Sequence, residues 1–292
     1  MISELKKVSK IKEDADLTKY NTYRIHSKAK CIVFPSSLKE LGEVLRIINK
    51  YKSKYFVIGN GSNIILPNYY DGIIIKLDKF NNVKIEKDYV YVECGYMINK
   101  LAMELVNMGY SALEWASGIP ATIGGCVYNN AGAYNSDISN YLISALIFDG
   151  ENVKEYSNED LKFDYRSSLL KNNKSLIVLS CKLKIIKSDK KELKKLVIER
   201  TNKRIQTQDL SHPSCGSVFR NPSFSPAGKL IDDLGFKGYK INDAMVSNIH
   251  ANFIINNGQA TQEDIVALIN IIKKEVKSNY NVDLVLEQEI IE

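Results

Sequence analysis

The sequence predicts an α+β fold with a mixed rather than a purely parallel sheet, spread over two or three domains. Apolar stretches typical of strands alternate irregularly with stretches of helical periodicity. At 292 residues, the chain is also longer than one average domain needs. Gln206–Pro226 is rich in turn formers and holds three of the six prolines, which predicts that a second part begins near residue 205.

Local patterns place the first helix and the first strands. Ser36-Ser37 can cap a helix with one apolar face, and the apolar run Tyr55–Ile58 predicts a buried strand that ends at Gly59. The apolar helix face consists of Leu38, Leu41, Val44, Leu45 and Ile48. Further strands are predicted at Gly72–Leu77, Tyr89–Cys94, Ile143–Phe148 and Leu176–Ile186, and a further helix at Ile98–Met108.

The C-terminal part is expected to hold two more helices and a last strand. A charged helix is predicted from about Lys191 to Arg204. Thr261 and Asp264 resemble a capping box at the start of an amphipathic helix, and Asp283–Ile291 predicts a strand. The apolar stripe of that helix is Ile265, Leu268, Ile269, Ile272 and Val276.

Composition and charge narrow the class of partner. Residues are 45% hydrophobic and 25% charged, as in ordinary globular proteins. Forty Lys and Arg against 34 Asp and Glu leave a formal charge of +6, a mild excess that suits small anionic ligands. The most basic stretch, Lys184–Lys195, has no aromatic ladder beside it to stack bases. We therefore interpret it as a solvated helix face and expect no nucleic-acid partner.

Cysteine usage and the absence of targeting patterns predict a cytoplasmic protein. Five cysteines are scattered without a C-x-x-C pair, which fits reduced thiols. They are Cys31, Cys94, Cys126, Cys181 and Cys215. Met1–Lys12 is charged throughout, and no apolar run approaches the ~20 residues that span a bilayer. No spacing of His, Cys, Asp or Glu matches a metal site, so we expect neither a metal nor a membrane partner.

Gly59-Asn60-Gly61-Ser62-Asn63 follows a predicted strand and could turn successive backbone N–H groups toward a phosphate. Ile64 occupies the third glycine position of G-x-G-x-x-G, and the P-loop pattern is absent as well, so neither a Rossmann nor a P-loop assignment holds. A tight exit from the strand, with Asn side chains in Asx-turns, is an equally good interpretation of this segment.

A second group of small residues follows at Gly118–Gly125 and Asn129–Tyr134. Little side-chain bulk there implies that something approaches the backbone closely. A pyrophosphate and a planar ring system would fit, because narrow grooves for flat cofactors are built from Gly, Ala and backbone amides. The alternative is a close crossing of two packed backbones.

Three polar segments could carry chemistry: Tyr165–Ser168, Pro213–Pro222 and Leu286–Glu289. Each has an ordinary structural explanation. Arg166 could form a surface ion pair, Ser217 could be a turn residue after Gly216, and Glu289 could be exposed on a terminal strand.

Hydrolytic chemistry is not indicated. Ser217 lies outside any G-x-S-x-G pattern, and only three histidines could serve as its base. Cys215 could be a thiol nucleophile with His212 or His250 as its partner, but a buried, inert thiol is the commoner case.

Taken in order, these segments resemble the motif series of the UDP-N-acetylenolpyruvoylglucosamine reductase family from about Asn21 to Glu289. Asn21–Arg24 is similar to the family's first motif, the two glycine-rich regions to its flavin loops, and the three polar segments to its arginine, serine and terminal glutamate motifs. Similarity to the substrate domain is carried by Ala227–Ile231, Gly235–Gly238, Val246–Ser247 and His250–Ile254.

The resemblance implies an FAD-binding domain of the vanillyl-alcohol-oxidase (PCMH) type at residues 1–204, with lobes at about 15–77 and 78–204. A substrate domain at 205–280 and a strand at 281–292 that returns to the FAD domain would complete the chain, as in the shorter family type without a tyrosine loop. The residues implied to bind FAD are Gly59, Asn60, Gly61, Ser62, Asn63, Gly118, Ile119, Pro120, Thr122, Gly124, Gly125, Ala131 and Gly132.

The activity implied is NADPH-dependent, FAD-mediated reduction of UDP-N-acetylglucosamine enolpyruvate to UDP-N-acetylmuramate, in peptidoglycan precursor synthesis. The residues implied to be catalytic are Arg166, Ser217 and Glu289, and a monomer is expected. Those implied to bind substrate are Tyr165, Arg220 and Asn221, and candidates for the diphosphate by charge are Lys229, Lys237 and Lys240.

Some positions depart from the family pattern. His26-Ser27 stands where paired glycines are usual, Asn135-Ser136 where glycine is common, and Arg220 where lysine is frequent. Arg220 keeps the positive charge but positions an oxygen differently from an ammonium group. Two other functions remain open: another oxidoreductase, such as a sugar oxidase, on the same flavin domain, and a non-catalytic nucleotide-sugar binding protein.

Overall fold

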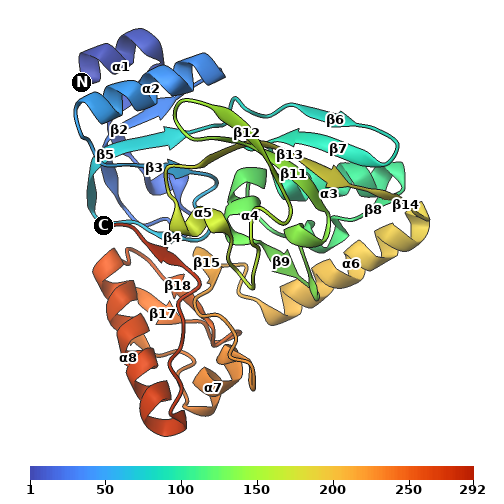
Figure 1. The fold of residues 1–292 in the computed structure, drawn as a ribbon. Coiled ribbons are helices and arrows are strands. Elements are labelled where there is room, and N and C mark those ends of the chain that lie inside the picture. The colour runs from blue at the N-terminus through green and yellow to red at the C-terminus, as the bar shows by residue number, and fades with distance from the viewer. The chain divides into compact units, whose positions relative to one another are not determined.

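The computed structural model describes all residues from 1 to 292, and the chain forms two compact units. Unit 1 consists of Met1–Glu13, Cys31–Asn60 and Gly72–Asn202. Unit 2 consists of Asp14–Lys30, Gly61–Asp71 and Lys203–Glu292. Each unit is therefore assembled from three separate segments of the chain (Figure 1).

The main sheet of unit 1 has five antiparallel strands in the order β12-β11-β13-β7-β6. Helices α3 and α4 belong to the same unit, and α4 packs against β13 and β7. The bounds are β6 Val83–Ile85, β7 Tyr89–Glu93, β11 Leu142–Phe148, β12 Val153–Ser157, β13 Ile177–Lys184, α3 Ile98–Met108 and α4 Ile123–Asn129. The apolar core of the unit includes the fully buried Trp115.

A second sheet has the order β1-β2-β5-β3. Strands β3 and β5 pair in parallel, with Tyr55 opposite Ile73, and α1 packs against α2. The bounds are α1 Ile2–Val8, β1 Lys10–Asp16, β2 Lys28–Phe34, α2 Leu38–Lys50, β3 Tyr55–Ile58 and β5 Tyr69–Lys76. The parallel pair beside antiparallel sheets gives the mixed topology expected from the sequence.

Unit 2 contains an antiparallel sheet in the order β15-β18-β17-β16, covered by α8, with α7 against α8 (Figure 1). A short parallel pair joins β4 to β19. The bounds are β4 Ile64–Ile65, β15 Ser214–Ser217, α7 Ala227–Asp233, β16 Lys240–Ile241, β17 Ala244–Val246, β18 Phe253–Asn256, α8 Gln262–Tyr280 and β19 Glu289–Ile290.

The remaining elements complete the chain. Strand β8 pairs with β14, and β9 with β10. The bounds are η1 Thr18–Tyr20, β8 Tyr110–Ser111, η2 Glu114–Ala116, β9 Gly132–Ala133, β10 Ser136–Asp137, η3 Ile138–Asn140, α5 Leu169–Asn172, β14 Ile186–Lys187 and α6 Lys190–Thr207.

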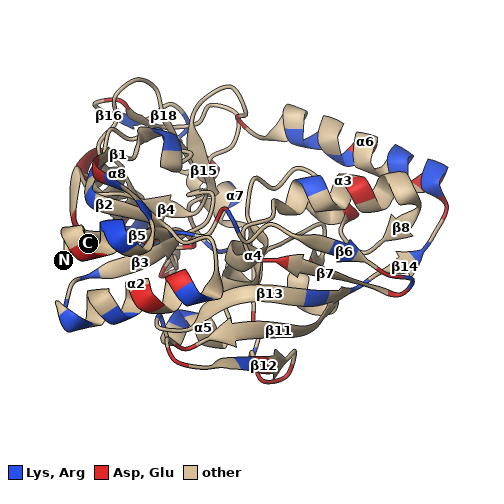
Figure 2. Ribbon diagram, turned by 90° about the horizontal axis from the view of Figure 1, so that it is seen from above, with Lys and Arg blue, Asp and Glu red and all other residues tan.

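The helix signals in the sequence are confirmed where a cap was identified. Ser37 accepts a hydrogen bond from the Glu40 N–H at the start of α2, and Thr261 and Asp264 form a reciprocal capping box at the start of α8. The charged helix α6 is slightly longer than predicted and carries Lys and Arg along its length (Figure 2). No helix in the structure combines the length and the apolar character that crossing a membrane requires.

The strand predicted at Asp283–Ile291 is wrong over most of its length. Only Glu289–Ile290 is a strand, preceded by an isolated bridge at Leu286 and a bend at Gln288. The Arg220 N–H donates to the Val285 carbonyl, whereas the Glu289 N–H donates to the Asn63 carbonyl. Since the segment exchanges one pairing partner for another, it bends between them and cannot form one continuous strand.

Candidate active site

In unit 1, the start of the first glycine-rich loop lies against the second glycine-rich segment. The Asn60 side-chain amide donates to the Pro120 carbonyl at 2.7 Å. A Cβ atom built on Gly59 would lie 2.5 Å from Thr122 Oγ1, so glycine is required for this approach. Lys76 Nζ donates to the Gly59 carbonyl at 2.7 Å and holds the loop from the other side. Two regions about sixty positions apart in the sequence are thus brought together.

The backbone of the first loop keeps hydrogen-bond donors available. The N–H groups of Asn60, Gly61 and Ser62 donate to no other group of the chain. Gly61 has a φ of 65°, the left-handed conformation that turns adjacent N–H groups toward one side. The Asn60 side chain bonds another loop instead of closing an Asx-turn. These donors fit the phosphates of a dinucleotide, and the chemistry of the site is therefore compatible with FAD.

The second segment shows the close backbone approach that its small residues predicted. A Cβ on Gly124 would lie 3.0 Å from Cys94 Cβ, and one on Gly132 would lie 2.4 Å from the Ser136 carbonyl oxygen. Thr122 caps α4 by accepting from the Gly125 N–H at 3.4 Å. Glycine is required here by packing within the chain, and contact of this segment with a cofactor stays a prediction.

Arg166 lies in a tight turn that is fixed against the second segment. Asp164 and Ser167 exchange two backbone hydrogen bonds of 3.0 and 3.1 Å, and Arg166 between them has a φ of 55°. Its guanidinium Nη2 donates to the Gly132 carbonyl at 2.6 Å, and its Cζ lies 5.1 Å from the centre of the Tyr165 ring. Because a non-glycine residue rarely adopts this φ, its surroundings determine the conformation. The turn directs one positive charge to the edge of the glycine-rich segment.

In unit 2, Ser217 lies at the end of β15 and lines a cavity of about 450 Å³. The lining contains both charge signs: Lys229 pairs with Asp233 at 2.8 Å and Lys237 with Asp232 at 2.7 Å. The full lining is Ser217, Asn221, Pro226, Gly228, Lys229, Asp232, Asp233, Lys237, Ile249, His250, Ala251 and Asn252. Lys240 is not part of this wall.

The predicted substrate residues differ in their surroundings. Asn221 lines the cavity, and its Oδ1 accepts from the Ala227 N–H at 3.0 Å where α7 begins. Arg220 precedes it, and its backbone N–H donates to the Val285 carbonyl at 2.9 Å. Tyr165 in unit 1 is exposed. Of the three, only Asn221 is among the residues that line the cavity.

Within unit 2, Glu289 and Ser217 are linked through Gln288, the residue that precedes Glu289. Glu289 begins β19, where its N–H donates to the Asn63 carbonyl at 2.9 Å. The neighbouring Gln288 amide donates to the carbonyls of Gly216 at 3.2 Å and Ser217 at 3.4 Å. Ser217 and Glu289, two of the three residues predicted to be catalytic, therefore lie on segments that are hydrogen-bonded to each other.

Cys215 is a buried structural thiol in this fold. Its Sγ lies 3.1 Å from Thr22 Oγ1 and within 3.5 Å of the carbonyl oxygens of Gly61 and Ile64. Burial raises the pKa of the thiol to about 11, which disfavours a thiolate at neutral pH. Neither His212 nor His250 is among its hydrogen-bond partners. A nucleophilic thiol at this position is not supported.

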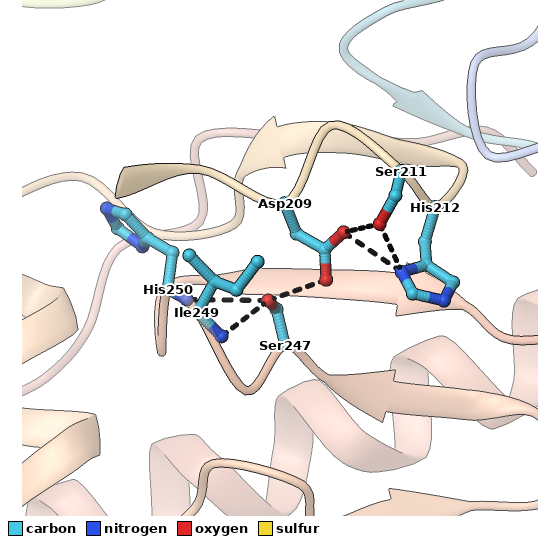
Figure 3. Close-up of polar contacts among 6 residues, drawn as sticks. All are labelled: Asp209, Ser211, His212, Ser247, Ile249 and His250. Carbon is cyan, nitrogen blue, oxygen red and sulfur yellow. Dashed lines mark hydrogen bonds and ion pairs between the residues drawn. The ribbon is translucent and has the colours of Figure 1, made fainter. Parts of the chain in front are cut away.

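A buried carboxylate stabilises the turn that carries His250, as the hydrogen bonds in Figure 3 show. His250 is one of the residues that line the cavity. Asp209 accepts hydrogen bonds from Ser211, His212 and Ser247, each at 2.9 Å. The Ser247 hydroxyl in turn accepts from the N–H groups of Ile249 at 3.1 Å and His250 at 3.4 Å. The turn is therefore held by a chain of hydrogen bonds that ends on Asp209.

His250 is prepared to act as a neutral donor. Burial is the main cause that lowers the pKa of its imidazole, and the nearby Lys237 lowers it further. Its Nδ1 accepts from the Asn252 N–H at 3.2 Å, which leaves the proton of the neutral ring on Nε2. The ring thus adds an N–H donor to the cavity wall without adding charge.

Asp209→Asn should lower the free energy of unfolding at pH 7 by about 1–3 kcal/mol, because an amide cannot accept at both terminal atoms. Burial raises the pKa of Asp209, but the hydrogen bonds from His212, Ser211 and Ser247 outweigh it and leave the pKa below the ordinary value. The carboxylate then stabilises the fold above its unfolded pKa and loses this effect as the pH falls through the folded value. The difference in the free energy of unfolding between wild type and variant should therefore become smaller below about pH 4.

Urea unfolding at several pH values measures this difference. Asp283→Asn is the matched control, because its carboxylate is 81% exposed and pairs with Lys277 at the surface. Its removal should change stability by less than about 1 kcal/mol. If the loss of unfolding free energy in Asp209→Asn did not vary with pH, the assigned role of the carboxylate would be contradicted.

Several residues that shape these sites were not singled out in the sequence. Lys76 stands out only as a charged residue in the run Ile73-Ile74-Ile75-Lys76-Leu77, and it is 8% exposed. Asn252 fixes the backbone of Phe219 through two side-chain hydrogen bonds of 2.9 and 2.8 Å. Gln288 lay within the polar segment Leu286–Glu289 but was assigned no role of its own, and Asp209 had no distinguishing local pattern, because their hydrogen-bond partners include residues far away in the sequence.

Comparison with known proteins agrees with these features. Residues 29–152 match the family profile of an FAD binding domain, and residues 208–291 match the C-terminal domain of UDP-N-acetylenolpyruvoylglucosamine reductase. The UDP-N-acetylenolpyruvoylglucosamine reductase of Bacillus licheniformis is 37% identical over 296 residues, covering 100% of this chain and 98% of that protein. The Bacillus subtilis enzyme of the same name gives the same identity and coverage.

Solved structures agree as well. The crystal structure of UDP-N-acetylenolpyruvylglucosamine reductase from Thermus caldophilus has a TM-score of 0.83 and 30% identity, covering 97% of this chain and all of that one. A chitooligosaccharide oxidase, at 17% identity and a TM-score of 0.51, covers 63% of this chain and 43% of its own, and shows the fold alone. The predicted α+β fold, an FAD-binding domain of the vanillyl-alcohol-oxidase type followed by a C-terminal domain, is confirmed. The chain belongs to the UDP-N-acetylenolpyruvoylglucosamine reductase family.

Proposed function

We propose that this protein catalyses the NADPH-dependent, FAD-mediated reduction of UDP-N-acetylglucosamine enolpyruvate to UDP-N-acetylmuramate, a step of peptidoglycan precursor synthesis. The observation that carries the proposal is the 450 Å³ cavity of unit 2, where Ser217 shares a wall with Lys229, Lys237 and His250. A hydroxyl proton donor beside cationic and N–H groups suits a substrate that bears both a reactive double bond and phosphates.

Residues of the two glycine-rich regions would hold the cofactor. The N–H groups of Asn60, Gly61 and Ser62 are available for phosphate, and we propose that the second glycine-rich segment, which includes Gly124 and Gly132, contacts the rest of the cofactor. When bound there, FAD supplies hydride transfer from NADPH to the methylene carbon of the enolpyruvyl group.

The chain's own residues would stabilise the charge and supply the proton. Negative charge develops on the neighbouring carbon and its carboxylate when the methylene carbon gains hydride. We assign Arg166 as a fixed positive charge for that carboxylate, and Glu289, if its carboxyl group is protonated, as a hydrogen-bond donor to it. Ser217 donates its hydroxyl proton to the carbanionic carbon, which is basic enough to take a proton from a weak acid.

The wider expectations are part of the same proposal. We propose an FAD domain at 1–204, a substrate domain at 205–280 and a returning terminal segment at 281–292. The architecture would be that of the shorter family type without a tyrosine loop. We also propose a monomer in the cytoplasm. Five buried cysteines without a disulfide are compatible with that compartment.

The proposal predicts that purified holoenzyme oxidises NADPH only when UDP-N-acetylglucosamine enolpyruvate is present and dioxygen is kept low. The measurement is the loss of NADPH absorbance in the near ultraviolet, with and without the substrate. NADPH oxidation independent of the substrate would instead indicate another oxidoreductase on this flavin fold. Binding of the nucleotide sugar without any NADPH oxidation would indicate a binding protein.

A further inference from the structure

The side chain of Gln288 is buried in unit 2 beside both Ser217 and Glu289. It is 3% exposed and lies at the bend between the Leu286 bridge and β19. A glutamine is rarely buried unless its amide is fully bonded, because an unpaired polar group costs free energy in the interior. The bonds of this amide therefore indicate what the residue does.

Three hydrogen bonds fix the orientation of the amide. Gln288 Oε1 accepts from the Tyr23 hydroxyl at 2.9 Å, and Nε2 donates to the carbonyls of Gly216 and Ser217 at 3.2 and 3.4 Å. Tyr23 is fully buried, and its own carbonyl accepts from the Asn256 side chain at 2.9 Å. A rigid donor on one side thus forces the amide nitrogen toward the Ser217 backbone.

The backbone around Ser217 needs this support. Gly216 has a φ of 72°, and a Cβ there would meet no atom within 4 Å, so packing does not restrict it. The pairing of β15 with β18 is also irregular between Ser214 and Ser217. Regular strand pairing is therefore interrupted just before the residue whose hydroxyl must be aimed at substrate.

We infer that Gln288 is a positioning residue for the reductase reaction, which sets the Ser217 hydroxyl relative to the adjacent Glu289 by clamping the Gly216–Ser217 carbonyls to the Tyr23 hydroxyl. It contacts neither substrate nor cofactor in this role. The inference rests on the proposed function, because it assigns a task to the proposed proton donor.

Gln288→Met removes the amide at nearly constant volume and tests the clamp. In the holoenzyme, the rate of flavin reoxidation by UDP-N-acetylglucosamine enolpyruvate should fall about 10- to 100-fold, since an error of about 1 Å in a reacting group costs up to about 10²-fold. The rate of flavin reduction by NADPH and the KM for the substrate should stay at wild-type values. Tyr23→Phe should show the same pattern with a smaller loss.

Gln262→Met is the matched control for a structural effect. The Gln262 amide is also in unit 2 and donates to two carbonyls, those of Ile65 at 3.0 Å and Ile291 at 2.9 Å. The Gln262→Met substitution should lower the Tm about as much as Gln288→Met does, and it should leave the rates of flavin reduction and reoxidation unchanged. Equal slowing in the Gln262 and Gln288 variants, or an unchanged reoxidation rate in Gln288→Met, would overturn the inference alone. Wild-type flavin that the substrate does not reoxidise would overturn the proposed function and the inference with it.

Discussion

Replacement of Ser217 by alanine is expected to slow reoxidation of the reduced enzyme by UDP-N-acetylglucosamine enolpyruvate by about 10²- to 10⁴-fold, the usual contribution of a positioned acid. Reduction by NADPH should proceed at the wild-type rate, because that half-reaction needs no proton from the serine. The hydroxyl lines the cavity of unit 2, so its removal takes away a donor without disturbing the apolar core. Stopped-flow absorbance of the flavin measures the two half-reactions separately.

Ser214→Ala provides the control on the same strand. Ser214 is half-buried at the start of β15 and pairs with Ile255, but it does not line the cavity. This variant should keep both rates. If Ser217→Ala lost both half-reactions equally, or if Ser214→Ala lost reoxidation to the same degree, Ser217 would not be the proton donor.

Gly61→Ala is expected to lower the free energy of unfolding by roughly 3–5 kcal/mol, from about 1–2 for the left-handed conformation and the remainder for overpacking. Gly61 has a φ of 65°, and an added Cβ would lie 2.0 Å from the Tyr20 carbonyl oxygen and 2.8 Å from Asn21 Cα. Both obstacles are backbone atoms, so the loop must move. The same movement would displace the N–H groups proposed to bind FAD, and flavin content should fall as well.

Gly216→Ala separates the two costs. Gly216 has a similar φ of 72°, but a Cβ there would meet no atom within 4 Å. In this variant the free energy of unfolding should therefore fall by only about 1–2 kcal/mol, the cost of the left-handed conformation. Urea unfolding without bound flavin measures the free energy of unfolding of the two variants. If both lost the same free energy, the contact of the added Cβ at position 61 with Tyr20 would cost nothing.

The helices show how much can be predicted from local sequence. The predicted bounds of the helix Ile98–Met108 agree with α3, and the capping serine and threonine placed the starts of α2 and α8. Caps and apolar stripes act within a few residues of one another, so their pattern is visible without the fold. The strand at Tyr89–Cys94 was predicted for the same reason. A strand also forms at Tyr55–Ile58, but the prediction that it is buried is wrong, because Val57 is 37% exposed and only Ile58 is buried.

The candidate sites were only partly predictable. The order of the glycine-rich and polar motifs predicted the family, which the comparisons confirm. It did not indicate that Lys76 binds the carbonyl of Gly59, or that Lys240 lies outside the cavity wall whereas Lys229 and Lys237 line it. Charge and position in the sequence indicate which residues could bind an anionic ligand. The path of the backbone in the folded chain decides which of them line the cavity.

The sequence by itself therefore determined the fold class, the family and the positions of the capped helices, because these depend on short-range patterns and on the order of motifs. The tertiary structure decided where the last segment pairs and what Gln288 does. The Tyr23–Gln288 hydrogen bond joins residues 265 positions apart, and the segment around it bends because its backbone exchanges Val285 pairing with Arg220 for Glu289 pairing with Asn63. Such partners become neighbours only when the chain is folded, so no local pattern can specify them.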